Sequence, residues 1–215
     1  MSKAIFSGFQ ARESDSLNSA GSPPSSDSNQ IMMQALKNST VDLSAFSRQI
    51  SQVSRTLKGD KEALEGLRNF VKEFGQSSDK TQAVSQITAL QKTETTDKGT
   101  LKSVFQTAED LGKIGGSVSQ FVGTVSGISS SENRQAFIGQ VQDVATDTES
   151  SVLDRRTTLK DINNTANAAI KQAGKDEKQQ NSNLSELFTG LAQADTLQDK
   201  GNFLKEFRSD LQNTA

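Results

Sequence analysis

The chain of 215 residues has no cysteine, no histidine, no tryptophan and no tyrosine, and phenylalanine is its only aromatic residue. Without Cys and His it cannot form a Cys/His zinc site, a thiolate nucleophile, a disulfide or a Ser-His-Asp triad. Its 24 basic and 26 acidic residues nearly balance, whereas nucleic-acid-binding proteins normally carry a basic excess. We therefore expect a non-enzymatic protein with no metal, no other cofactor and no specific nucleic-acid partner.

Proline and long apolar runs are equally scarce. The only prolines are Pro23 and Pro24, and two successive fixed φ angles forbid a continuous helix there. Residues 1–28 are therefore predicted to form an extended polar arm, in which Phe6 and Phe9 are candidate anchors into a partner groove. The first 20 residues lack the apolar stretch of a secretory signal peptide, and no apolar run reaches the roughly 18 residues of a membrane span.

The chain is rich in small polar residues and in helical periodicity. Ser, Thr, Asn and Gln together supply 79 residues, more than the hydrophobic residues, which make up 32% of the chain. Apolar residues recur at steps of three and four, which is typical of helices that bury one narrow stripe. We predict an all-α fold, namely an elongated helical bundle of coiled-coil-like hairpins with a long central helix and an extended N-terminal arm.

Residues 29–92 are predicted to form about three helices, followed by a polar loop at 93–100. The first of these helices has the spacing of a heptad seam, in which apolar residues of one helix pack against another helix. We interpret these residues as a helix–helix association seam: Leu43, Phe46, Ile50, Val53 and Leu57.

A glycine-rich helix near 101–128 and a long heptad helix near 132–173 are predicted next. In the first, Gly112, Gly116, Gly123 and Gly127 recur at a spacing that permits close helix approach. One interpretation is transient membrane contact through residues 111–128. The polar Ser and Thr residues between the glycines favour the alternative, close packing of two soluble helices.

The second helix carries the most regular pattern of the chain and predicts a rod of roughly 54 Å at about 1.5 Å per residue. Arg155 stands in this otherwise apolar seam, where it either needs a polar partner or marks a turn of the exposed face. The proposed association residues of this helix are Ile138, Val141, Val152, Arg155, Leu159 and Ile162.

A charged linker at 174–183 and amphipathic helices over 184–215 complete the predicted organisation. Asp143, Asp147 and Glu149 lie close together on the predicted helix, with Asp143 and Asp147 one turn apart. A hard-cation site needs more oxygen ligands, and a glycosidase-like pair needs a cleft between different elements. The cluster is therefore interpreted as a solvated helix face. A Ser–Lys pair could supply a serine nucleophile, but neighbouring Ser and Lys residues are expected by chance in a chain with so many of both. No catalytic, cofactor-binding or metal-ligating set is therefore assigned.

These patterns favour a structural or assembly component of a large macromolecular machine, working as a homo-oligomer or with other protein subunits. The first hypothesis is an internal, neck or tail component of a bacteriophage virion. The second is an exported filament, tip or translocator subunit of a bacterial secretion system. A soluble helical effector or binding module and a membrane-active ejection protein are the remaining alternatives.

Overall fold

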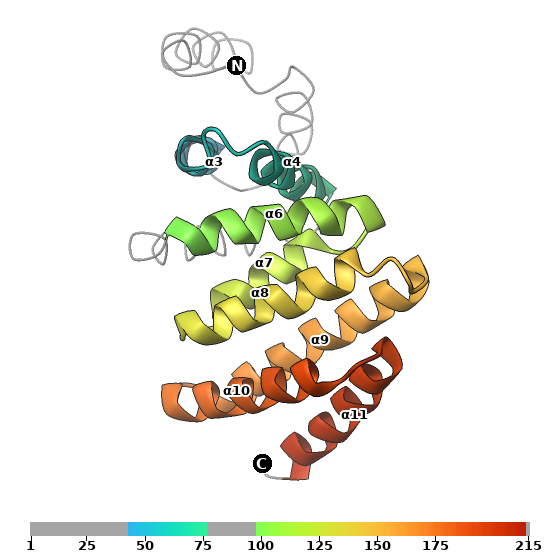
Figure 1. Cartoon of the computed structure of the whole chain (residues 1–215). Coiled ribbons are helices and arrows are strands. Elements are labelled where there is room, and N and C mark those ends of the chain that lie inside the picture. Colours follow the sequence, from blue (N-terminus) through green and yellow to red (C-terminus); the bar gives the residue numbers. More distant parts are fainter. Residues whose placement is uncertain (1–42, 77–97, 214–215) are drawn as a thin grey trace, which may run out of the picture.

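The computed structural model describes residues 43–76 and 98–213, and every regular element in these ranges is an α-helix (Figure 1). The prediction of an all-α helical fold is confirmed. The arm at 1–28, with Phe6 and Phe9, and the third helix expected before residue 93 lie outside the described residues. The helices are α3 (Leu43–Thr56), α4 (Lys61–Gln76), α6 (Lys98–Ile114), α7 (Val118–Gly127), α8 (Ser131–Thr146), α9 (Val152–Ala173), α10 (Glu177–Gln193) and α11 (Leu197–Asn213).

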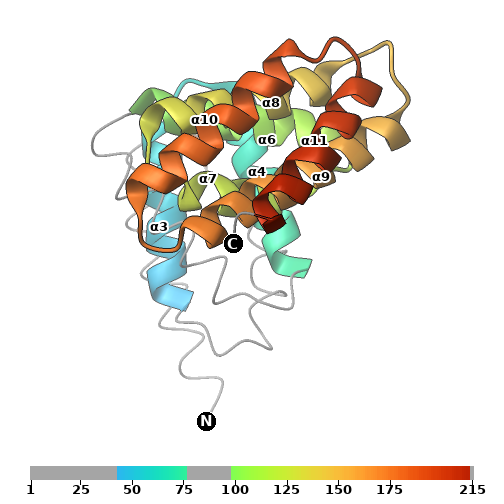
Figure 2. The same ribbon diagram turned by 90° about the horizontal axis from the view of Figure 1, so that it is seen from below.

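Helices α6 to α11 form three successive hairpins, α6–α7, α8–α9 and α10–α11, that stack on one another. One layer contains α6, α8 and α10, and the other contains α4, α7, α9 and α11 (Figure 2). Each helix contacts its neighbours in its own layer as well as helices of the opposite layer. Each hairpin therefore buries its apolar faces against the next hairpin, as in helical repeat proteins.

One continuous apolar core runs through the stack. The rings of Phe121 in α7 and Phe137 in α8 stack with their centroids 5.7 Å apart, and Phe137 lies 5.9 Å from Phe188 in α10. At the other end, Phe70 in α4 meets Phe105 in α6 edge to face at 6.3 Å. Such ring pairs stabilise beyond their buried area, so aromatic contacts join consecutive hairpins where the aliphatic stripes are narrow.

The prediction of one long helix over 132–173 is wrong, because the chain reverses between α8 and α9. The Asp147 carboxylate accepts hydrogen bonds from the backbone N–H groups of Glu149 (2.8 Å) and Ser150 (3.3 Å). Ser151 then caps α9, since its hydroxyl oxygen accepts from the Asp154 N–H at 3.1 Å. These side chains satisfy the backbone groups that a continuous helix would have paired. The expected central rod is replaced by a hairpin.

The glycine-rich helix predicted over 101–128 is likewise two helices. Gly115 adopts a φ of +66°, and the Gly116 N–H donates to the Leu111 carbonyl at 2.8 Å. This is the hydrogen-bond pattern that ends helices at a left-handed glycine. Ser117 begins α7 by accepting from the Gln120 N–H. Two of the glycines thus serve a turn and do not continue a helix.

The predicted linker at 174–183 is mostly helical, and the described end of the loop expected at 93–100, residues 98–100, is helical as well. Asp176 caps α10 by accepting from the N–H groups of Lys178 and Gln179, so only residues 174–176 of the predicted linker at 174–183 lie outside a helix. Helix α6 starts at Lys98, inside the loop expected at 93–100. Lys, Glu and Gln are good helix formers, and polar composition was the wrong criterion for a linker here.

Helices α4 and α6 approach each other closely at Gly66. A Cβ atom at Gly66 would overlap the Phe105 carbonyl oxygen and would lie 2.9 Å from the Glu109 backbone nitrogen. Only glycine allows the two backbones to meet at this distance. The spacing patterns in the sequence did not identify Gly66.

Gly66→Ala should therefore destabilise the protein by about 2–3 kcal/mol, because α4 must move away from α6. Urea unfolding followed by circular dichroism measures this change. Gly139→Ala in α8 is the matched control, since no atom lies within 4 Å of its Cβ position. It should stabilise the protein by about 0.5–1 kcal/mol through helix propensity alone. Equal effects of the two substitutions would contradict the close approach.

Candidate interaction site

Most residues of the two proposed association seams are buried inside this chain. Ile50 is half-buried against the core, and the side chains of Leu43 and Phe46 lie outside the described part of the structure. The apolar seam residues that belong to the core are Val53, Leu57, Ile138, Val141, Leu159 and Ile162. These side chains therefore contribute to packing within the chain, between its own helices.

Val152 is the exception among the predicted seam residues, and it identifies a different surface. As the first residue of α9 it is 43% exposed, and the adjacent Leu153 is 72% exposed. They are the only large apolar side chains classed as exposed in the part of the chain that the structure describes. Since Val141 and Val152 belong to different helices, a single seam cannot contain both. We call Val152 and Leu153, with the turn at 147–151, the α8–α9 corner.

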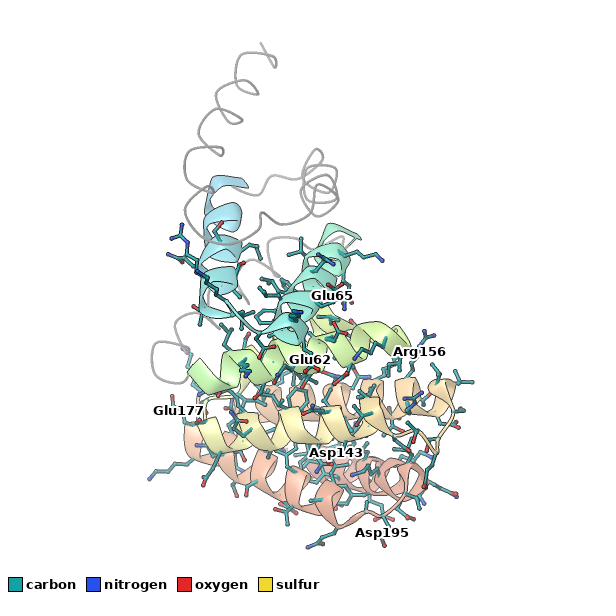
Figure 3. The ribbon with its side chains drawn as sticks, turned by 45° about the horizontal axis from the view of Figure 1, so that its top comes forward. Glu62, Glu65, Asp143, Arg156, Glu177 and Asp195 are labelled. Carbon is teal, nitrogen blue, oxygen red and sulfur yellow. The ribbon has the colours of Figure 1, made fainter. Side chains whose placement is uncertain are left out.

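Two arginines fix the α8–α9 corner to the bundle. Nη1 of Arg155 donates to the Ala145 carbonyl at 2.9 Å, so this seam residue has its polar partner within the chain. Nε of Arg156 donates to the Ile114 carbonyl at 2.6 Å, where α6 ends, as the position of Arg156 in Figure 3 illustrates. Cations favour helix C-terminal carbonyls. The corner is thereby attached to both α8 and α6.

Most of the charged side chains that are exposed at the corner are acidic, although Arg156 is exposed as well. Both guanidinium groups are hydrogen-bonded to carbonyl oxygens of the bundle, while Asp143, Glu149 and Asp154 are exposed. The corner is therefore an apolar pair of side chains beside exposed carboxylates, on backbone that capping side chains hold in place.

Of the four singled-out glycines, Gly112 and Gly127 are exposed but lie beside side chains of neighbouring helices. A Cβ at Gly112 would overlap the Asn69 side chain of α4, and one at Gly127 would lie 3.3 Å from Ile170 in α9. Gly116 forms the turn between α6 and α7, and Gly123 is half-buried in α7. Among the described helices, none combines the length and apolarity needed to cross a membrane.

A second surface feature is an open groove of about 540 Å³ on the last hairpin. The Phe203 ring of α11 lies directly on Gly190 of α10, where a Cβ atom would overlap it. The lining residues are Ser182, Ser185, Glu186, Thr189, Gly190, Gln193 and Phe203. The sequence patterns did not predict that Gly190 and Phe203 line a surface groove.

A half-buried lysine, Lys200, stabilises the hairpin that carries this groove. Nζ of Lys200 donates to the Leu191 carbonyl at 2.6 Å and to Oε1 of Gln140 at 2.8 Å. Burial lowers the pKa of Lys200, and Asp143 of α8, which Figure 3 labels, opposes this shift. Lys200 thus fastens the start of α11 to the end of α10 and to α8.

Sequence patterns missed Leu153 because it does not belong to either periodic stripe. The available signal was the polar run from Asp147 to Ser151 followed by two apolar residues. A helix start at that point places both residues in the first turn of a new helix, where no preceding turn covers them.

Within the described residues no group of three or more Asp and Glu side chains is arranged to hold a metal ion.

In comparisons with known proteins, no family model, no curated protein and no solved structure matches this chain. The α8–α9 corner and the groove are therefore the features of the molecule from which a function is inferred.

Asp147 should titrate below its ordinary pKa, because the Ser150 hydroxyl and the Glu149 N–H both favour its carboxylate. The contribution of these bonds is fully present above the ordinary pKa and is lost as the pH falls through the lowered value. Carboxyl-carbon NMR titration measures the midpoint. Ser150→Ala should raise it towards the ordinary value, whereas Ser209→Ala, on α11, should leave it unchanged. An ordinary midpoint in the unsubstituted protein would refute the described turn.

Proposed function

We propose that this chain is a non-enzymatic assembly component that joins a larger protein machine through the α8–α9 corner. The observation that supports this proposal is Leu153, which is 72% exposed on a turn held by side-chain hydrogen bonds. Leaving large apolar side chains in water forgoes about 1.5–3 kcal/mol each. A protein partner that covers Val152 and Leu153 would recover this free energy.

The rigidity of the corner strengthens the proposal. Ser151, Asp154 and Arg155 hold the backbone around the two apolar residues through short hydrogen bonds. Contacts on a preorganised backbone lose less conformational entropy on binding than contacts on a mobile loop. The nearby carboxylates add charge that orients an incoming partner.

The machine that we propose first is a bacteriophage virion, and a bacterial secretion apparatus is the second setting. Composition supports both settings, because chains without Cys and Trp, made largely of small polar residues, are tolerated in both. Both settings require assembly through protein–protein contact, and the exposed apolar residues of the corner support that requirement.

A soluble helical binding module is a second candidate function. It is favoured by the burial of Ile138, Val141, Leu159 and Ile162 within a single chain, because a core completed inside one copy needs no second subunit to fold. This candidate would use the same corner to bind a different protein, without self-association.

Light scattering of the chromatographed protein over a concentration series tests the assembly proposal. Self-association should raise the mass above that of one chain as concentration increases, and Leu153→Asp should weaken it by about tenfold or more, because a carboxylate is costly to desolvate at an interface. Ala168→Asp, on an exposed position of the same helix, is the matched control and should behave as the parent protein.

Circular dichroism should show equal helicity for both variants. A parent protein that keeps the mass of one chain at all concentrations would reject self-association and favour the binding module. If Leu153→Asp left a measured self-association unchanged, the corner would not be the contact surface.

A further inference from the structure

We propose that the groove on the α10–α11 hairpin binds a basic amphipathic helix of a partner protein. This inference concerns a different surface from the α8–α9 corner and stands independently of it. It follows from the position of the groove in the stack, from its lining and from the charge around it.

The groove occupies the place where the stack would continue. Within one layer, α8 lies against α6 and also contacts α7, and α10 lies against α8 and also contacts α9. By the same rule, the next helix in this layer would contact α10 and α11. The groove is lined by residues of those two helices. A helix supplied by a partner can therefore extend the layer with the packing already used inside the chain.

The lining is suited to a helix and not to a small ligand. Ser182 and Ser185 are small residues on one face of α10, and small residues let helix backbones approach closely, as Gly66 does between α4 and α6. Phe203 supplies one apolar anchor and is only partly buried by the core. An aromatic anchor flanked by small residues matches an amphipathic helix laid along a groove.

The charge of this hairpin favours a basic occupant. Within residues 177–213, six acidic residues are exposed and only two basic residues are, Lys178 and Lys205. Two of the acidic residues, Glu177 and Asp195, lie at the two ends of α10 (Figure 3). Glu186 lines the groove itself, and no ion pair among the described residues engages it. A Lys or Arg on the incoming helix would complement this charge.

The same charge argues against a second copy of the chain as the occupant. Two identical α10–α11 faces would bring their exposed carboxylates together, and like-charge juxtaposition disfavours association. A helix of different composition avoids that repulsion.

The experiment uses the full chain, labelled for NMR, and a synthetic helical peptide of about 18 residues with leucine on one face and lysine on the other. A control peptide carries glutamate in place of each lysine. The lysine peptide should shift the resonances of α10 and α11, and the glutamate peptide should bind about tenfold more weakly or not at all. Shifts spread equally over α4 and α8, or equal binding of both peptides, would overturn the proposal.

Two pairs of variants locate the peptide on the groove. Ser185→Trp fills the groove and should weaken binding by about tenfold or more, whereas Ser209→Trp, exposed on α11 outside the lining, should not. Glu186→Lys should weaken binding by roughly fivefold and more than Glu206→Lys does, because only Glu186 lines the groove. Circular dichroism confirms that each variant is folded. Equal effects within either pair would mean that the peptide does not bind in the groove and would reject the proposal.

Discussion

The reversals that lead into α7, α8, α9 and α10 depend on side chains that take over the backbone hydrogen bonds of helix ends. Ser117, Ser130, Ser151 and Asp176 accept from the first N–H groups of α7, α8, α9 and α10. The Glu73 carboxylate of α4 adds a hydrogen bond from the Ser119 N–H at 2.9 Å. The apolar stripes are narrow, so they bury one another only when the chain turns at these points. Capping thus determines which stripes meet.

The apolar spacing of the sequence predicts which residues are buried but not where helices end. Ile138 and Leu159, both predicted as residues of one association seam, lie in the core of this chain. They belong to different helices, because the two stripes continue in the same phase across the turn. The polar run at 147–151 contained the stop signal, but an unbroken spacing on either side outweighed it. Close approaches such as Gly66 against Phe105 depend on helix crossing, which no local pattern encodes. The candidate surfaces were missed for the same reason: the exposure of Leu153 follows from the turn, and the groove follows from the stacking.

The two proposed binding surfaces lie on two different hairpins. The α8–α9 corner offers apolar side chains on rigid backbone, whereas the α10–α11 groove offers a recess with small residues and acidic charge. The protruding corner and the recessed groove therefore differ in both geometry and chemistry. A chain that carries both can bind two neighbours of different kinds at once, which is the property that an assembly component needs.

The stacking of hairpins also has a consequence for how the chain folds. Among α6–α11, the main backbone contacts join each helix to the next helix along the chain or to the one after it. Such topologies have low contact order and fold quickly, because few long loops must close before native contacts form. Each hairpin can dock on the one before it as the chain leaves the ribosome, so that synthesis from the N-terminus builds the array one hairpin at a time.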